Sequence, residues 1–128
     1  MSVSPNELLS LADAVLRDAT TEAEWRNAVG RAYYAVFHAA IAFHDSLPSP
    51  GRTPPKQTGV HEGLAFRLSW PTMHPDHPKY PTSRALGRSL RWLSKKRVEA
   101  DYYLKLSFSE ADALEVLERA REAIDLTK

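Results

Sequence analysis

The chain has 128 residues, of which 43% are hydrophobic, enough to bury one continuous core but hardly two, so we expect a single domain over residues 1–128. It contains no cysteine, which excludes disulfides, thiolate metal ligands and thiol nucleophiles and makes the cytoplasm the expected compartment. The net charge is only +1, no basic and apolar leader begins the chain, and no apolar run approaches the roughly 20 residues that cross a bilayer, so no membrane association is expected.

The first predicted helix begins at a capping box. In the segment SPNE, residues 4–7, Ser4 is a typical N-cap, the proline occupies the first helical position, where its missing N–H costs nothing, and Glu7 closes the box. Apolar residues then recur at intervals of three and four, which predicts a helix to about Arg17 with one buried face. That face is expected to contain Leu8, Leu11, Ala12, Val15 and Leu16.

The second predicted helix is the longest, and it also begins at a cap. Thr21 and Glu24 have the spacing of a capping box, no proline interrupts the segment up to about Asp45, and only Gly30 weakens its helical propensity. At 100° per residue, one narrow stripe of this helix is apolar, and we expect it to face the core. The stripe contains Trp25, Val29, Ala32, Val36, Ala40 and Phe43.

The opposite face of the second helix carries side chains suited to phosphate chemistry. It contains Asn27, Arg31, Tyr34, His38 and Asp45, with Ile41 at its edge. Arg31 and His38 are seven residues apart, which is two turns, or about 10.5 Å of rise, and Tyr34 lies between them. An imidazole can exchange a proton near neutral pH, and a guanidinium can hold a phosphate oxygen and stabilise the extra charge of a pentacovalent transition state.

Cleavage of an RNA phosphodiester is the reaction that this trio suits. The 2′-OH of RNA is itself the nucleophile, so the reaction requires no metal, no cofactor and no cysteine. A homodimer that packs this face against its twin would bring two copies of each side chain together, and the outward Tyr34 and Ile41 favour such a contact. The alternative is an ordinary solvated helix face, on which an arginine and a histidine two turns apart occur by chance.

Two proline-rich stretches flank a short predicted helix. Residues 47–58, LPSPGRTPPKQT, hold four of the nine prolines and can be neither helix interior nor central strand. A short helix is expected from about Gly59 to Leu68. Residues 69–82 hold four more prolines and are predicted to form a second irregular stretch.

Two more long helices complete the predicted fold. Ser83 is the expected cap of a helix to about Leu104, whose buried side contains Leu86, Leu90, Leu93, Ala100 and Leu104. Ser107 and Glu110 are expected to cap the last helix, with Leu114, Leu117, Ala120, Arg121 and Ile124 in register. No segment alternates with a period of two over strand length. The sequence therefore predicts an all-α fold, an up-and-down bundle of four main helices plus one short helix.

Charge is unevenly distributed over the last two helices. Residues 79–97 hold seven Lys or Arg and no acid, whereas residues 110–125 hold six acids and two arginines. Four of these cations fall in one stripe opposite the leucines, with Trp92 and Lys96 beside it: Arg84, Arg88, Arg91 and Lys95. The stripe is a candidate RNA-binding surface, because clustered cations release counterions and an aromatic ring can stack a base. The alternative is a solvated face paired with the acidic last helix.

The remaining polar and aromatic residues indicate no further site. His61, His74 and His77, with Asp76, lack the helical spacing and supporting partners of a zinc site, so we assign no metal ligand. The aromatic side chains of Tyr33 and Tyr102 are expected to close the bundle, each hydroxyl finding a partner at its edge. Further aromatics are expected in the core, namely Trp25, Phe37, Phe43 and Phe108.

Several segments together resemble HEPN domains, small helical proteins found beside minimal nucleotidyltransferases and in toxin and defence loci. The string RNAVGRAYYAVFHAA, residues 26–40, is similar to the characteristic helix of that family. Three further pieces agree in order: Thr58-Gly59-Val60 before a short helix, RVEADY at residues 97–102, and FSEADA at residues 108–113. The likeness covers roughly residues 5–125.

The resemblance implies an activity and a set of partners. Many HEPN proteins are described as metal-independent ribonucleases with an Arg-x(4-6)-His motif that acts across a dimer. Arg31 and His38 match the six-residue spacing, so the resemblance implies that they bind phosphate and exchange protons, with Asn27 and Tyr34 as neighbours. RNA, a second copy, and a nucleotidyltransferase or antitoxin protein are the implied partners.

The same resemblance also fits a protein without catalytic activity. A HEPN module that binds a nucleotide, or a nucleotidyltransferase or other effector, would use the same face of the second helix for docking. In that case Arg31 would pack or form an ion pair, for instance with Asp101.

Overall fold

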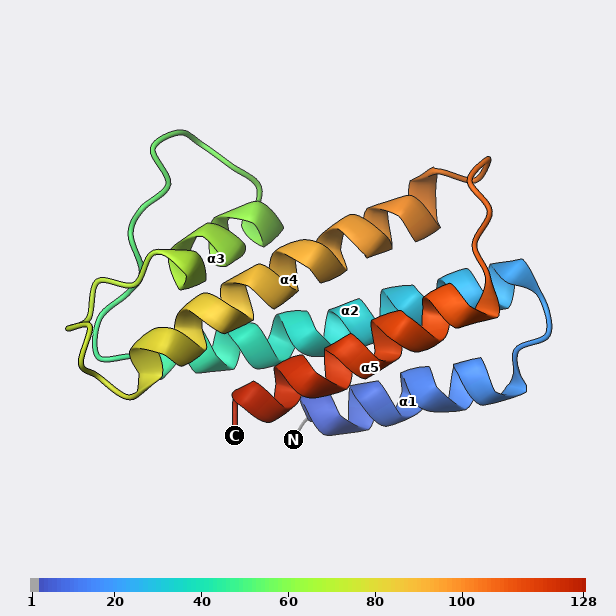
Figure 1. Ribbon diagram of the computed structural model, residues 1–128, viewed down its shortest axis with the longest axis horizontal. Coiled ribbons are helices and arrows are strands. Elements are labelled where there is room, and N and C mark those ends of the chain that lie inside the picture. Colours follow the sequence, from blue (N-terminus) through green and yellow to red (C-terminus); the bar gives the residue numbers. More distant parts are fainter. Residues whose placement is uncertain (1–2) are drawn as a thin grey trace.

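Five α-helices make up the computed structural model, which describes residues 3–128, and no strand occurs within that range. The helices are α1 (Pro5–Asp18), α2 (Glu22–Asp45), α3 (Val60–Ser69), α4 (Lys79–Tyr102) and α5 (Glu110–Leu126). The four long helices alternate in direction along the bundle, and the short α3 lies against one end of α4 (Figure 1). The predicted all-α, up-and-down bundle of four main helices and one short helix is confirmed.

The first two helices begin where their capping residues predict. The Ser4 hydroxyl accepts a hydrogen bond from the Glu7 amide at 3.1 Å, and the Glu7 carboxylate accepts one from the Ser4 amide at 3.3 Å. At α2, the Thr21 hydroxyl oxygen accepts from the Glu24 amide at 3.3 Å. These bonds satisfy backbone donors that have no partner in the first turn of a helix, which is why a local sequence pattern fixed both starts.

The start predicted for the fourth helix is wrong. The helix α4 begins at Lys79, so Ser83 lies inside it, and the irregular stretch before it is shorter than residues 69–82. Pro81 is tolerated because it falls in the first turn, where its missing N–H removes no helical hydrogen bond. Ser83 is fully buried and donates its hydroxyl to the Leu68 carbonyl at 2.7 Å. The serine therefore joins α4 to the end of α3 instead of capping a helix.

The cap predicted for the last helix is also wrong, by two residues. Ser109, not Ser107, is the N-cap of α5, and it forms a capping box with Asp112 through bonds of 3.1 and 2.8 Å. The reason lies in Phe108, which is buried just before the cap and donates its amide N–H to the Glu22 carboxylate of α2 at 2.6 Å. Packing of this phenylalanine selects between two caps that the sequence offers equally.

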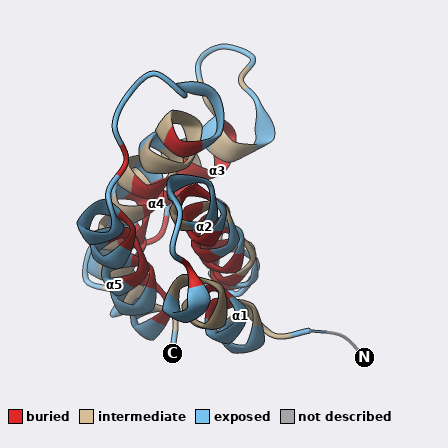
Figure 2. Ribbon diagram, turned by 90° about the vertical axis from the view of Figure 1, so that its right-hand side faces the viewer, coloured by how far each residue is buried: buried red, intermediate tan, exposed pale blue. Residues whose placement is uncertain are grey.

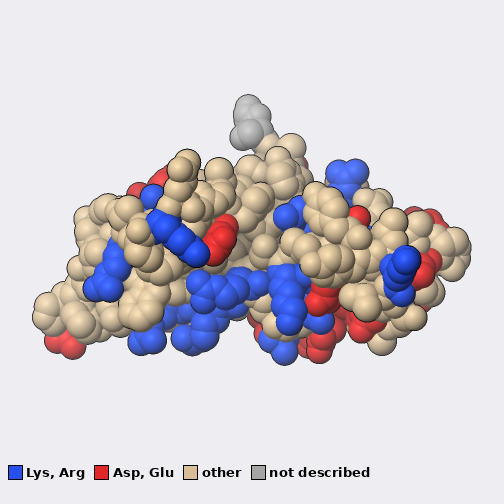
Figure 3. Space-filling view, turned by 90° about the horizontal axis from the view of Figure 1, so that it is seen from above, with Lys and Arg blue, Asp and Glu red and all other residues tan. Residues whose placement is uncertain are grey.

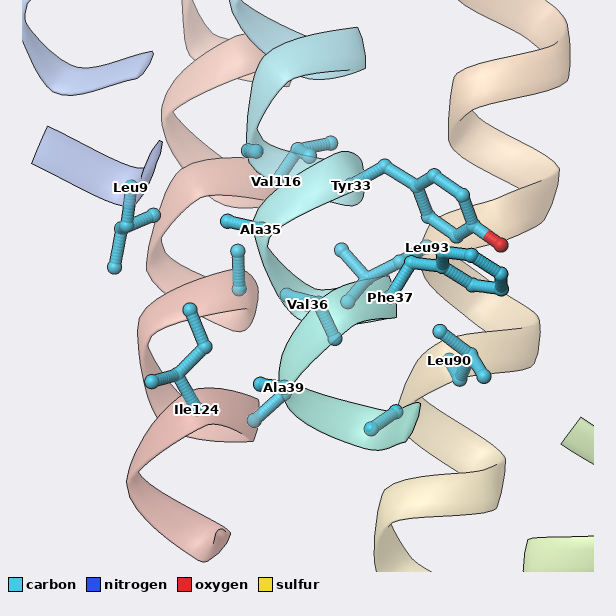
Figure 4. Close-up of a cluster of buried hydrophobic side chains, with 14 of the residues drawn as sticks. Leu9, Tyr33, Ala35, Val36, Phe37, Ala39, Leu90, Leu93, Val116 and Ile124 are labelled. Atoms are coloured by element: carbon cyan, nitrogen blue, oxygen red, sulfur yellow. The ribbon is translucent and has the colours of Figure 1, made fainter. Parts of the chain in front are cut away.

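The core lies between α2 and the helices around it, and the exposed residues lie on the outer faces (Figure 2). Figure 4 shows the centre of this core, where Tyr33 and Phe37 of α2 extend toward Leu90 and Leu93 of α4. On another side of α2, alanines allow close approach of α1 and α5. The largest fully buried apolar side chains are Tyr33, Leu68, Leu86, Leu90, Leu93, Val29, Val36 and Val116. The predicted core stripe of α2 is confirmed except at Trp25, which is only half-buried.

Three leucines predicted to be buried are exposed. The exposed fractions are 45% for Leu11, 70% for Leu104 and 52% for Leu114. Leu104 lies beyond the last residue of α4. Leu11 lies outside the buried stripe of α1, which contains Leu9, and Leu114 lies outside that of α5, which contains Leu117. Arg121, predicted to be in register with the core of α5, is exposed and pairs with Asp13 of α1 at 2.9 Å. A spacing of three or four identifies the buried side of a helix but not the width of the buried stripe.

The segment between α2 and α4 is held to the bundle by specific contacts. His44 accepts a hydrogen bond from the Gly51 amide at 3.0 Å, and the Arg52 amide donates to the Trp70 carbonyl at 2.8 Å. Gly51 approaches the Arg67 backbone so closely that a Cβ atom at this position would collide with it. None of the helices formed by residues 3–128 is both long and apolar enough to span a bilayer.

Candidate functional site

The outer face of α2 carries the residues predicted for phosphate chemistry. Asn27 and Arg31 are exposed, Tyr34 is 52% exposed and His38 is half-buried. Helical geometry places these side chains on one side because they are spaced by three, four and seven residues. The residues thus line one accessible face that extends along two turns and more of the helix.

The His38 ring is held in place by aromatic neighbours. It lies edge-on to the Tyr34 ring, with centroids 4.3 Å apart, and edge-on to the Phe37 ring at 5.6 Å. Within residues 3–128, no side chain or backbone group forms a hydrogen bond or ion pair with His38 or with the guanidinium of Arg31. Both groups can therefore bind a ligand or a second protein without first breaking a hydrogen bond or an ion pair.

The suggested ion pair between Arg31 and Asp101 does not form. Asp101 pairs instead with Arg97, one helical turn before it on α4, at 3.5 Å. The expectation that Arg31 has a structural role through this pair is wrong. Asp101 does lie beside α2, because a Cβ atom added to Gly30 would be 3.8 Å from its carboxylate.

The arginine with a structural role is Arg26, which the sequence analysis did not single out. Its side chain is buried and donates to backbone carbonyls at the end of α4 and beyond: Glu99 at 3.0 Å, Ala100 at 2.9 Å, Tyr103 at 3.3 Å, and Leu106. It also pairs with Glu22 at 3.3 Å. The sequence did contain an indication of this role. Arg26 lies three residues before Val29 and seven before Tyr33, both core residues, and this spacing places it on the buried side of α2.

A second histidine contacts the same aromatic cluster, and sequence reasoning had considered it only as a metal ligand. The His61 Nδ1 lies 2.7 Å from the Tyr33 hydroxyl, and its ring centroid is 4.4 Å from that of Phe37. Tyr33 is 1% exposed, as predicted for a residue that closes the bundle, whereas Tyr102 is 68% exposed and does not do so. Phe37 thus contacts both His38 and His61.

Burial controls the charge of this histidine and tyrosine. Burial lowers the pKa of His61, and the nearby positive charge of Arg97 lowers it further. Burial also raises the pKa of Tyr33, although the Ser94 hydroxyl and Arg97 oppose this effect. The Arg97 guanidinium lies over the Tyr33 ring, 5.3 Å from its centroid. Both His61 and Tyr33 therefore favour their uncharged forms at neutral pH.

A groove continues from the outer face of α2 toward α3. It has a volume of about 570 Å³ and begins at Ile41, one turn after His38. Its other walls come from the loop at residues 53–59 and from α3, with Lys56 and Arg67 as the basic side chains. Its two cationic side chains suit a negatively charged ligand.

The four predicted cations of α4 lie together on the surface. Arg84, Arg88, Arg91 and Lys95 are all exposed, and no ion pair with α5 or any other described element involves them. Lys and Arg side chains gather in a band along one edge of the molecule, with acidic side chains next to it (Figure 3). The stripe is therefore solvated, as its alternative interpretation expects, but it forms no direct ion pair with the acids of α5, and RNA binding by it stays a prediction.

Trp92, expected beside the stripe, has its ring covered by other side chains. The Arg119 guanidinium lies 4.6 Å from the centre of that ring, and the Lys96 ammonium lies 5.4 Å from it. Because Trp92 is half-buried between these cations, it contributes to the contact between α4 and α5. The stripe is thus a band of charge beside a partly covered aromatic ring, which still lines a small pocket together with Arg88.

The remaining histidines do not assemble into a cluster. His74 lies 3.7 Å from Asp76, and both side chains are exposed in the loop before α4. Across residues 3–128, no three His, Asp or Glu side chains converge in a way that would hold a metal ion.

Comparison with known proteins identifies one family. The model of the HEPN domain matches residues 8–128, which is nearly the whole chain. Searches of curated proteins and of solved structures found no match. The family match covers all of α2 to α5 and most of α1, including the outer face of α2 described above. The chain belongs to the HEPN domain family.

Proposed function

We propose that this protein is a metal-independent RNA-cleaving HEPN domain that acts as a dimer, as in toxin and defence ribonucleases. The observation that carries the proposal is the presence of Arg31 and His38 on one accessible face of α2, with neither side chain bound by the rest of the chain. An arginine and an imidazole that form no hydrogen bond or ion pair within the described chain, on one accessible helix face, suit the binding and cleavage of a phosphodiester.

The proposed reaction is an internal transesterification. The imidazole of His38 takes the proton of a 2′-OH, the 2′-oxygen bonds to phosphorus, and the bond to the 5′-oxygen breaks. A proton returns to the departing 5′-oxygen, leaving a 2′,3′-cyclic phosphate and a 5′-OH. Arg31 stabilises the negative charge that accumulates on the phosphate oxygens of the transition state. Tyr34 holds the imidazole ring, and Asn27 lies beside the bound RNA.

A dimer explains how one histidine per chain serves a reaction with two proton transfers. The outer face of α2 offers one imidazole, whereas the reaction requires a base and an acid on opposite sides of the phosphate. Two copies packed through this face would supply both, and the half-exposed Tyr34 at its centre gives them apolar surface to bury. In this arrangement, the exposed stripe from Arg84 to Lys95 holds the RNA backbone.

The test is cleavage of RNA in the presence of EDTA. Wild-type protein should cut RNA and leave 2′,3′-cyclic phosphate ends, and His38→Ala should lower the rate at least about 100-fold, because general acid–base catalysis contributes that much or more. His74→Ala is the matched control, since this histidine is exposed in a loop away from the site.

The control should cut like the wild type, and both variants should keep the helical circular dichroism and the dimer. Cutting by His38→Ala at the wild-type rate would disprove the assigned role. If the wild type cuts no RNA but His38→Ala weakens binding of a nucleotidyltransferase, antitoxin or nucleotide, the face of α2 is a docking surface of a non-catalytic HEPN module.

A further inference from the structure

A second groove, separate from the one at Ile41, lies between α3 and α4. It has a volume of about 450 Å³ and is lined by Gly59, His61, Glu62, Ala65, Arg91 and Ser94. Three of these residues carry hydrogen-bond donors of different kinds: a guanidinium, an imidazole and a hydroxyl. The groove also meets the basic stripe of α4, because Arg91 belongs to both.

The imidazole in this groove has one ring nitrogen available. The Tyr33 hydroxyl occupies Nδ1 of His61 at 2.7 Å, so Nε2 is the atom left for a ligand. When the tyrosine donates its proton to Nδ1, the uncharged ring carries its hydrogen on Nε2 and becomes a donor there. The buried tyrosine thus fixes the orientation of the histidine ring and, with its hydroxyl as the donor, also selects the tautomer that carries hydrogen on Nε2.

The charges at the groove favour an anion. The exposed Arg91 forms no ion pair with Glu62, the carboxylate among the lining residues, and Lys95 follows it one turn later along the stripe. Arg97 adds positive charge behind the groove, where its guanidinium lies over the Tyr33 ring. Phe37 connects the groove to the face of α2, since its ring contacts both His61 and His38.

We propose that the groove between α3 and α4 is a subsite for one phosphate of an RNA backbone that runs along the basic stripe. The Arg91 guanidinium and the Nε2–H of His61 are its donors, and the Ser94 hydroxyl, which interacts with Tyr33, lines the groove beside them. This subsite lies outside the Arg31 and His38 pair and positions the RNA instead of taking part in bond cleavage. It rests on the proposed function only in taking RNA as the ligand.

The experiment measures binding without chemistry. A fluorescent 2′-O-methyl oligoribonucleotide, which has no free 2′-OH and cannot be cut, is titrated with full-length protein over a series of salt concentrations. Arg91→Ala should weaken binding several-fold and lower the slope of log affinity against log salt by about 0.7, the value for one phosphate contact on a single strand. Glu62→Gln should tighten binding, because it removes the carboxylate from the groove.

The matched control is Arg17→Ala, which removes the same charge from the exposed end of α1, a helix without contact to α4. It should leave the slope at the wild-type value. His61→Gln should weaken binding while the circular dichroism stays that of a folded bundle. The subsite is wrong if the wild type does not bind the oligonucleotide, or if Arg91→Ala changes the salt slope no more than Arg17→Ala.

Failure of this proposal is distinguishable from failure of the proposed function. A protein that cuts RNA through His38 but binds equally well without Arg91 has the activity and lacks the subsite. Conversely, a protein that cuts no RNA, yet loses one phosphate contact with Arg91→Ala, has the subsite and lacks the activity.

Discussion

Two arginines five residues apart on α2 have opposite roles. Arg26 is buried and donates to four backbone carbonyls, and Arg31 is exposed and donates to no described group. The carbonyls that Arg26 reaches lie in the last turn of α4 and in the segment that follows it, where acceptors lack helical partners or have only one. The guanidinium, with five donors in a rigid fork, can satisfy several of them at once. Arg26 therefore stabilises the fold, whereas Arg31 is available for a ligand.

We predict that Arg26→Ala destabilises the protein by about 3 kcal/mol or more, because one buried and three partly buried carbonyls lose their donor at once. Arg31→Ala, which removes the same group from an exposed position of the same helix, should change stability by less than about 0.5 kcal/mol. Urea denaturation followed by circular dichroism measures both values. Equal effects of the two substitutions would contradict the structural role of Arg26.

At the scale of the elements, α3 lies close enough to α4 that only small residues fit between them. A Cβ atom added to Gly87 would lie 2.8 Å from the Ser69 amide nitrogen and 3.1 Å from the Ala65 carbonyl oxygen, with the Ser69 hydroxyl closer still. Ser83, one turn earlier, donates to the Leu68 carbonyl in the same contact. Because α3 carries one wall of both grooves, its position on α4 determines their shape.

We predict that Gly87→Ala costs about 1–3 kcal/mol of stability, since the added methyl group meets backbone atoms that cannot move without shifting α3. Gly30→Ala is the matched control, and we expect it to raise stability. Its methyl group would meet only the Asp101 carboxylate at 3.8 Å, an ordinary contact, and alanine is the better helix former by up to about 1 kcal/mol. Thermal melting of the two variants should therefore move in opposite directions, and a fall in both would show that the packing argument is wrong.

At the scale of the whole molecule, two half-buried histidines connect stability to pH. Burial lowers the pKa of both His44 and His61 below the ordinary value of 6.5. At His44, nearby Asp45 partly offsets this effect and Arg67 adds to it. His44 also accepts the Gly51 amide, a bond that requires an unprotonated nitrogen. In both cases the folded state favours the neutral ring.

The sign of the pH effect follows from proton uptake. Well above pH 6.5, both rings are neutral whether the chain is folded or unfolded, so they add no pH dependence. As the pH falls through 6.5, the unfolded chain binds protons before the folded chain does, and stability is lost until the lower pKa values of the folded state are passed. We predict that the melting temperature falls between about pH 7 and pH 5.5.

Substitution of His44 tests this origin. His44→Gln keeps an acceptor for the Gly51 amide but removes one titrating ring, so its melting temperature should depend less on pH over that range. His74→Gln, in the exposed loop before α4, is the matched control and should retain the wild-type slope. A His44→Gln protein with the wild-type slope would contradict the assignment.

Much of this molecule was predictable from its sequence because the signals are local. The capping box at Ser4, the N-cap at Thr21, the prolines between α2 and α4, and the apolar period of α2 act over a few residues, and each fixed an element or its buried side. The same period placed Asn27, Arg31, Tyr34 and His38 on one outer face, as the structure has them. The roles assigned to them stay predictions.

The tertiary structure decided what depends on residues far apart in the chain. The contact between Glu22 and Phe108, 86 positions apart, favours Ser109 as the N-cap of α5. Ser83 bonds to the Leu68 carbonyl and therefore caps no helix. Arg26 binds carbonyls more than 70 positions away. The pairing of Tyr33 with His61, which shapes the second groove, likewise exists only once α3 has packed on α4. Caps indicate where a helix begins, and the apolar period indicates which of its sides is buried. Which residues pack against that side depends on how all five helices fill one core.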